Sequence, residues 1–203
     1  HDVQLISPGG PFLNTAPQPR EAAMPEVIFP GPEGRLEGRY HPQKEKDAPI
    51  AIILHPHPQF GGTMNNKVVY NLHYAFHDMG FNVLRFNFRG VGASVGEHDY
   101  GNGEVDDCLA VLDWAQNNLA VRELWLLGFS FGGYVAAAAA SRLEQWPQRL
   151  VLVAPSVEKQ AFHLLKPLAG PVSVMMGEAD DVVAPQAVYA AFADEQDAEE
   201  DDD

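Results

Sequence analysis

The sequence predicts an α/β protein built on a doubly wound, mostly parallel sheet with helices on both faces. From residue 24 onward, strand-like segments alternate with helix-like segments, which is typical of parallel strands joined by right-handed crossovers. Some strand-like segments, such as residues 50–55, are apolar throughout, as expected for strands that are covered on both faces. Both observations favour one sheet between two layers of helices.

The predicted elements follow one another in a regular order. An antiparallel pair of strands comes first, at 27–29 and 36–40, because the proline and glycine residues between them favour a turn. The later segments are a strand at 50–55, a helix around 68–79, a strand at 81–88, a helix around 105–115, a strand at 123–129, a helix at 132–142, strands at 149–154 and 171–177, and a helix at 185–193. Ligands of such sheets bind at the carboxyl ends of the strands, so we expect a site there.

Residues 24–193 are predicted to form the folded domain, because 203 residues suffice for one domain of this kind but not for two. Residues 1–23 are rich in proline and glycine and lack the pattern of a signal peptide. We interpret them as a leader, an artificial extension or a displaced edge segment of the sheet. Residues 194–203 hold eight carboxylates and no base, and we expect a solvated acidic tail.

The charge balance argues against nucleic acid as a partner. The chain has 28 acidic and 13 basic residues, and without the eight carboxylates of the tail 20 acidic residues remain. Phosphate binding needs a basic surface. The sequence has no apolar run long enough to span a membrane, and its single cysteine, Cys108, fits a reducing compartment. We therefore expect a cytoplasmic protein without nucleic-acid or membrane partners.

Ser130 lies where a strand-like segment meets a helix-like one. The sequence Gly128-Phe129-Ser130-Phe131-Gly132 matches G-x-S-x-G, the pattern of a nucleophile elbow. Such a serine stands on strained backbone with its hydroxyl above the sheet, and side chains two positions away on either side would collide with strand and helix. The positive end of the following helix favours developing negative charge. Ser130 is therefore the predicted nucleophile, with a purely structural turn as the alternative.

A serine that transfers acyl groups needs two N–H donors for the oxyanion. The residue after the nucleophile, Phe131, is expected to supply one. The loop after the strand at 50–55 is expected to supply the other, and Pro56 and Pro58 have no N–H to offer. The second donor is therefore His57 or Gln59, unless this loop only connects strand to helix.

Asp180 is the candidate for the acid that orients a catalytic histidine. It lies three residues beyond the glycine that ends the strand at 171–177, and the acid follows the serine along the chain in this architecture. Asp181 and Glu178 are less well placed. Two adjacent aspartates in a loop are also typical of helix caps.

No cofactor and no metal site is predicted. His73 and His77 are four residues apart on a helix but lack a third ligand by spacing. Gly90, Gly92 and Gly96 do not satisfy the dinucleotide-binding pattern, and no helix opens there.

Four segments together resemble the small single-domain bacterial α/β-hydrolases related to dienelactone hydrolases and short-chain esterases. They are LHPHPQFGGTMNNKVV, LRFNFRGVGASVGEHDYGNGE, GFSFGGYVA and GEADDVVAPQAV, and the resemblance covers about residues 24–190. It implies an α/β-hydrolase fold with little or no lid, and a serine hydrolase that acts on carboxylic esters of small molecules through an acyl-enzyme at Ser130. It also implies Asp180 as the triad acid. Asn87 stands where this superfamily commonly has aspartate.

The resemblance breaks at the catalytic histidine. In the family, the acid is followed by a strand, a loop with the histidine and a closing helix, whereas no histidine follows Asp180 here. The last strand and helix are therefore missing or displaced, and the catalytic histidine is unknown. Residues 1–14 faintly resemble the missing strand and loop, with Pro11 or a deletion at the histidine position. Of the other histidines, we expect loop-fixing hydrogen bonds from His55 and His57 and surface positions for His98 and His163.

Two alternatives to an active esterase follow from this break. The chain is a catalytically impaired hydrolase-fold protein that binds a ligand or partner without turnover, or a truncated or rearranged form of an active parent. If no strand covers the edge at 172–176, that edge is exposed, which predicts association of copies of the chain through it.

Overall fold

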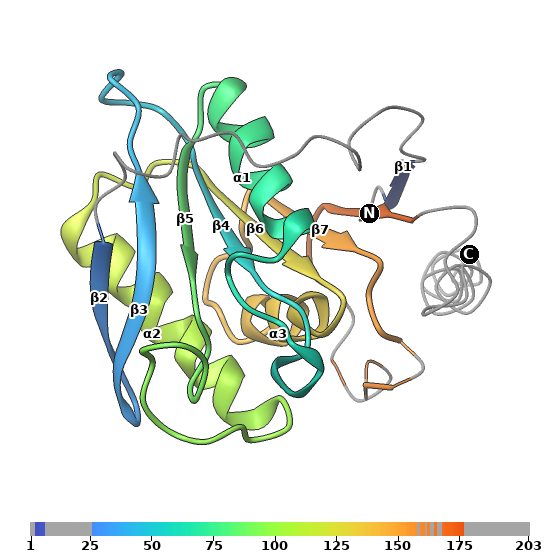
Figure 1. Ribbon diagram of the computed structural model, residues 1–203. Coiled ribbons are helices and arrows are strands. Elements are labelled where there is room, and N and C mark those ends of the chain that lie inside the picture. Colours follow the sequence, from blue (N-terminus) through green and yellow to red (C-terminus); the bar gives the residue numbers. More distant parts are fainter. Residues whose placement is uncertain are drawn as a thin grey trace, which may run out of the picture.

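The computed structural model describes residues 3–6, 26–157, 159, 160, 162, 165 and 168–176, which form an eight-stranded sheet with helices on both faces (Figure 1). The strands are β1 (Val3–Ile6), β2 (Glu26–Gly31), β3 (Gly34–His41), β4 (Ile50–Leu54), β5 (Asn82–Phe86), β6 (Leu124–Phe129), β7 (Arg149–Val153) and β8 (Val172–Met175). The helices are the short 3₁₀-helix η2 (Pro58–Phe60) and the α-helices α1 (Lys67–Asp78), α2 (Asn102–Asn118) and α3 (Phe131–Ala140).

The strand order is β1-β8-β7-β6-β4-β5-β3-β2. The six strands from β1 to β5 in this order are parallel, while β3 pairs antiparallel with both β5 and β2. The doubly wound, mostly parallel sheet predicted from the sequence is therefore confirmed. Within this order β6 lies between β4 and β7, so the segments that follow these three strands gather at one edge of the sheet.

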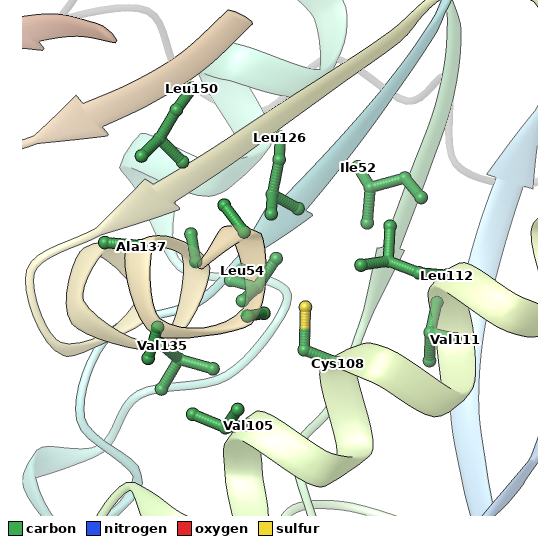
Figure 2. Packing of buried hydrophobic residues seen from close by; sticks show 14 of the residues in the cluster. Ile52, Leu54, Val105, Cys108, Val111, Leu112, Leu126, Val135, Ala137 and Leu150 are labelled. Carbon is green, nitrogen blue, oxygen red and sulfur yellow. The ribbon is translucent and has the colours of Figure 1, made fainter. Parts of the chain in front are cut away.

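The strands divide their side chains between two apolar layers. In β4, which is buried throughout, Ile52 and Leu54 face the layer of α2 and α3, while Ala51 and Ile53 face α1. Figure 2 shows Cys108 and Leu112 of α2 directed at the strand residues Ile52 and Leu126, with α3 alongside. The alanines of α3 are buried, and their small side chains let this helix pack closely against the sheet.

The edge of the sheet beside β8 is occupied by β1. Val3 pairs with Val172 and Ile6 with Met175, in parallel register. The predicted association of copies applied to an unpaired β8, and in the structure β8 has this strand beside it. The interpretation of residues 1–14 as the strand and histidine loop of the family stays a prediction, because residues 7–25 lie outside the described residues.

Some predicted boundaries move by a few residues. The helix predicted around 105–115 runs from Asn102 to Asn118, and the strand predicted at 81–88 ends at Phe86. The helix predicted at 185–193 lies outside the described residues. Across the described part of the chain, every helix is too short or too polar to cross a bilayer.

Candidate active site

Ser130 joins β6 to α3 on strained backbone. Its φ is 55° and its ψ is −116°, a region that residues other than glycine rarely enter. The Ser130 N–H donates to the carbonyl of Val153 at 2.9 Å, and its carbonyl accepts from the N–H of Gly133 at 2.9 Å. The side chain is half-buried and does not cap α3. The backbone is thus held from both sides while the hydroxyl takes no part in the cap.

The glycines on either side of Ser130 are required by close backbone contacts. A Cβ at Gly128 would overlap the carbonyl group of Gly132, and a Cβ at Gly132 would lie 2.5 Å from the carbonyl oxygen of Leu54. Both neighbours are backbone atoms, which cannot move aside without displacing a strand or helix. In the structure a side chain at either position would therefore collide, as expected from the G-x-S-x-G pattern.

The loop after β4 folds tightly onto itself around His57. The carbonyl of His57 accepts from the N–H groups of Phe60 at 3.1 Å and Gly62 at 3.0 Å, and its Nδ1 accepts from the N–H of Gln59 at 3.1 Å. The Gln59 N–H is thus used inside the loop. In the described part of the chain, the N–H groups of His57 and Phe131 donate no hydrogen bond.

His55 fastens the loop after β4 to the end of β5. The side chain is fully buried, its Nδ1 donates to the Pro56 carbonyl at 2.7 Å, and its Nε2 accepts from the Phe88 N–H at 3.0 Å. Burial lowers the pKa of His55 to about 4, so the ring is neutral at pH 7 and both nitrogens are committed. These contacts agree with the prediction that His55 makes hydrogen bonds that fix the loop.

Asn87, where the sequence resemblance led us to expect aspartate, faces a carboxylate. Its Nδ2 donates to Glu37 Oε1 at 2.6 Å, and its Oδ1 accepts from the N–H of Met64 at 2.8 Å. The backbone N–H of Asn87 also donates to the Glu37 carbonyl at 2.9 Å. An amide can donate to Glu37 and accept from Met64 at once, whereas an ionised aspartate could only accept.

An ion pair anchors the glycine-rich loop after β5 to α2. The guanidinium of Arg89 binds the carboxylate of Asp107, with Nη2 to Oδ1 at 2.9 Å and Nε to Oδ2 at 3.1 Å. Asp107 is fully buried and Arg89 nearly so. The loop that carries His98 is therefore held at its start by a charged, hydrogen-bonded pair.

The expectation that His98 lies on the surface is wrong. Its side chain is 10% exposed, and its ring packs against His57 and Tyr100, with centroids 4.9 and 4.8 Å away, and against Phe131 at 5.7 Å. Nδ1 lies 3.6 Å from Oε2 of the buried Glu104, and neither ring nitrogen makes a hydrogen bond among the described residues.

Glu104 is a buried residue of this site that the sequence did not predict. Its carboxylate accepts from the N–H groups of Asp99 at 2.9 Å and Gly101 at 2.8 Å, at the N-terminus of α2. An acidic residue three positions after a turn-forming glycine, here Gly101, is the signal that could have found it.

Three further histidines cluster away from Ser130. His41 Nδ1 lies 3.0 Å from His73 Nε2, Arg85 donates from Nε to His73 Nδ1 at 3.1 Å, and His77 stacks on His41. Burial first, then Arg85 and the neighbouring imidazoles, lower the pKa of His73 to about 2. His41 pairs with Val83 near the start of β5. These histidines therefore lie at the amino ends of the parallel strands, whereas Ser130 lies at their carboxyl ends. The described ranges contain no group of three side chains suited to hold a metal ion.

Several predicted site residues cannot be placed beside Ser130. Asp180, Asp181, Glu178 and His163 lie outside the described residues. The acid of the triad therefore stays a prediction from the sequence.

Comparison with known proteins gives matches over most of the chain. Residues 52–185 match the family model of the α/β hydrolase fold. The uncharacterized protein RP471 of Rickettsia prowazekii is 45% identical over 164 residues, which are 79% of this chain and 69% of that protein. The lysophosphatidylserine lipase ABHD12 of Xenopus tropicalis is 28% identical over 135 residues, which are 65% of this chain and 34% of the lipase. The chain thus spans about a third of that lipase's length.

Solved structures of bacterial proteins are similar in fold and sequence. A protein of unknown function from Agrobacterium tumefaciens, described as an α/β hydrolase, has a TM-score of 0.80 and 45% identity, covering 85% of this chain and 79% of that chain. XC6422 from Xanthomonas campestris, described as an α/β serine hydrolase without lid, has a TM-score of 0.77 and 40% identity, covering 84% of this chain and 78% of that chain.

Proposed function

The chain belongs to the α/β hydrolase fold family, and from this membership we propose a serine hydrolase that cleaves carboxylic esters of small molecules through an acyl-enzyme at Ser130. One observation carries the proposal: Ser130 stands on a strained turn at the carboxyl end of β6, between glycines that the backbone requires. Strain of this kind costs about 1–3 kcal/mol and concentrates at functional sites.

The reaction that fits this geometry has two halves. The Ser130 oxygen attacks the acyl carbonyl while an imidazole takes the hydroxyl proton, and the tetrahedral intermediate expels the alcohol, which receives that proton. Water then attacks the acyl-enzyme with the same imidazole as base, releasing the acid and restoring Ser130. Each step needs donors for the negative charge on the carbonyl oxygen.

Phe131 and His57 are the proposed oxyanion donors. The N–H of each makes no hydrogen bond within the described residues, whereas the Gln59 N–H is taken by His57 Nδ1. This difference favours His57 over Gln59, the two residues between which the sequence left the choice open.

The proposed acid is Asp180, on the resemblance and the chain order. For the base, the described histidines differ in whether a ring nitrogen is available. The neutral rings of His55 and His57 each have their single lone pair engaged by a backbone N–H. His98 has both nitrogens without hydrogen bonds, a carboxylate 3.6 Å away, and a ring against Phe131. His98 is therefore the first base to test among the described residues.

A second candidate function is binding without turnover. It is favoured by the described histidines His55 and His57, whose lone pairs are engaged by backbone N–H groups, since loss of the triad base removes most of the rate. Cytoplasmic location, a small-molecule partner and the lack of a nucleic-acid partner stay predictions.

Hydrolysis of p-nitrophenyl acetate by four proteins tests the proposal: the wild type, Ser130→Ala, His98→Gln, and His77→Gln as a control at the opposite edge of the sheet. We expect turnover that Ser130→Ala lowers by on the order of 10³-fold or more and that His77→Gln leaves unchanged. A comparable loss in His98→Gln would support His98 as the base, and full activity there would assign the base to another histidine. Turnover that survives Ser130→Ala would refute the proposal, and no turnover in the wild type would favour binding without catalysis.

A further inference from the structure

Four aromatic side chains form a continuous row, here called the aromatic arc: Phe60, His57, His98 and Tyr100. Successive ring centroids are 4.8, 4.9 and 4.8 Å apart, and successive planes are tilted by 58°, 47° and 69°. These separations are those of favourable aromatic pairs. The arc is assembled from two loops, one after β4 and the other after β5.

The arc borders the candidate active site. The ring of Phe131, the residue after Ser130, lies 4.8 Å from His57 and 5.7 Å from His98 between centroids. On the other side, the Nζ of Lys159 lies 5.8 Å from the centre of the Phe60 ring. Lys159 follows β7 and Phe60 follows β4, and β6 lies between these strands. The contact therefore joins the segments on either side of β6, the strand that Ser130 follows.

Both ends of the arc are open to solvent. Phe60 is 79% exposed and Tyr100 is 70% exposed. Within the described part of the chain five large hydrophobic side chains are exposed. Of the other three, Ile28 lies in β2, Met79 follows α1, and Val95 shares the loop after β5 with Tyr100. Exposed apolar rings gathered beside a reactive group are typical of a binding surface.

We propose that the aromatic arc binds a flat aromatic ring of the substrate, so that the esters cleaved at Ser130 carry an aromatic ring on the acyl or the alcohol side. The arc offers four rings in contact, and a planar aromatic group gains about 2- to 10-fold in affinity for each good ring pair beyond the area that it buries. A saturated ring of similar area gains only from the burial. The reaction at the ester bond rests on the proposed function above, but the binding of the ring does not.

The first test compares aromatic esters with saturated esters of the same size. Phenyl acetate and cyclohexyl acetate carry the ring on the alcohol side, and methyl benzoate and methyl cyclohexanecarboxylate carry it on the acyl side. The measured quantity is the ratio of kcat/KM for the aromatic ester to kcat/KM for the saturated one, in wild type and in the double variant Phe60→Leu/Tyr100→Leu. Leucine keeps apolar area and removes the ring, and comparing ratios cancels the different leaving-group reactivities.

We expect the double variant to lower this ratio about 5- to 10-fold for one of the two ester pairs, which would also assign the ring to the acyl or the alcohol side. Ile28→Ala, a change at another exposed apolar position, should leave both ratios unchanged. Active protein with unchanged ratios in the double variant would overturn the proposal. Because Phe60 and Tyr100 are exposed, we expect the variants to fold. If the double variant does not fold, the same ratios are measured in Phe60→Met.

The second test separates ring binding from catalysis. Acetophenone and cyclohexyl methyl ketone, which have no ester bond to cleave, are titrated by NMR into Ser130→Ala, with and without the two leucine substitutions. We expect acetophenone to bind at least about 5-fold tighter than the saturated ketone, and the difference to vanish in the leucine background. If this result is obtained and the wild type shows no esterase activity, the proposed function is refuted but the proposal that the arc binds an aromatic ring is supported. Equal binding of the two ketones, or no binding of acetophenone, would refute the arc.

Discussion

Replacing Asn87 by aspartate, the residue that the sequence resemblance implies at this position, is expected to destabilise this chain. Asn87 is 4% exposed, and its Nδ2 donates to Glu37 Oε1 at 2.6 Å. In the variant, two carboxylates would face each other at this distance. At an effective dielectric constant near 20, two charges about 4 Å apart repel by about 4 kcal/mol.

The folded variant can avoid this repulsion by taking up a proton. At pH 7, protonating a carboxyl group with an ordinary pKa also costs about 4 kcal/mol, and the shared proton returns part of this as a hydrogen bond. We therefore expect Asn87→Asp to lower the free energy of unfolding by about 3 kcal/mol at pH 7. The folded variant binds a proton that the unfolded chain releases at pH 7. The loss of unfolding free energy therefore becomes smaller as the pH is lowered, by about 1.4 kcal/mol per pH unit, and is small at pH 5.

Urea unfolding of the wild type and the variant at pH 5 and pH 7, followed by tryptophan fluorescence, measures this penalty. Adding Glu37→Gln to Asn87→Asp restores a donor facing an acceptor, and should recover stability at pH 7 to within about 1 kcal/mol of the wild type. Glu37→Gln alone is the matched control. A penalty that is equal at both pH values, or that Glu37→Gln does not relieve, would show that Asn87 is not held by this contact.

Three further outcomes are expected. Gly128→Ala should lower the free energy of unfolding by about 3 kcal/mol or more, because its Cβ overlaps the Gly132 carbonyl, whereas Gly133→Ala, whose Cβ lies 3.4 Å from its nearest neighbours, should cost far less; equal chemical denaturation midpoints would contradict this. The wild type should lose stability as the pH falls from 6.5 toward 4, because the buried rings of His55 and His73, with pKa values lowered to about 4 and about 2, stay neutral while the unfolded chain binds protons. Each ring contributes up to about 3 kcal/mol over this range, so His55→Gln should flatten the profile of unfolding free energy against pH, and an unchanged slope would contradict this. Cys108 is fully buried and burial raises the pKa of its thiol, so Ellman's reagent should label it only at the rate of unfolding, and immediate labelling of native protein would be inconsistent with this packing.

The parts of the fold that the sequence predicts are those that local patterns determine. A strand buried on both faces must be apolar throughout, which identifies β4, and the serine turn needs glycine because atoms a few residues away would collide with any side chain. Both constraints act over short stretches of chain. They can therefore be recognised without knowing the rest of the structure.

The parts that the sequence does not predict depend on contacts between distant segments. Burial of His98 results from two rings of other segments, His57 in the loop after β4 and Phe131 at the start of α3. The pairing of Asn87 with Glu37 joins residues 50 positions apart. β1 has four residues, too few to show a strand period, and it pairs with a strand near the other end of the chain. Asp180 lies outside the described residues, so its place in the site stays a prediction.

The nucleophile can be tested directly by a fluorophosphonate reagent, which forms a stable bond only with an activated serine. The native protein is treated with it and the modified peptide is identified by mass spectrometry, with Ser130→Ala and urea-unfolded protein as controls. We expect a single adduct on Ser130 that both controls lack. An unmodified native protein, or an adduct on another residue that persists in Ser130→Ala, would contradict it.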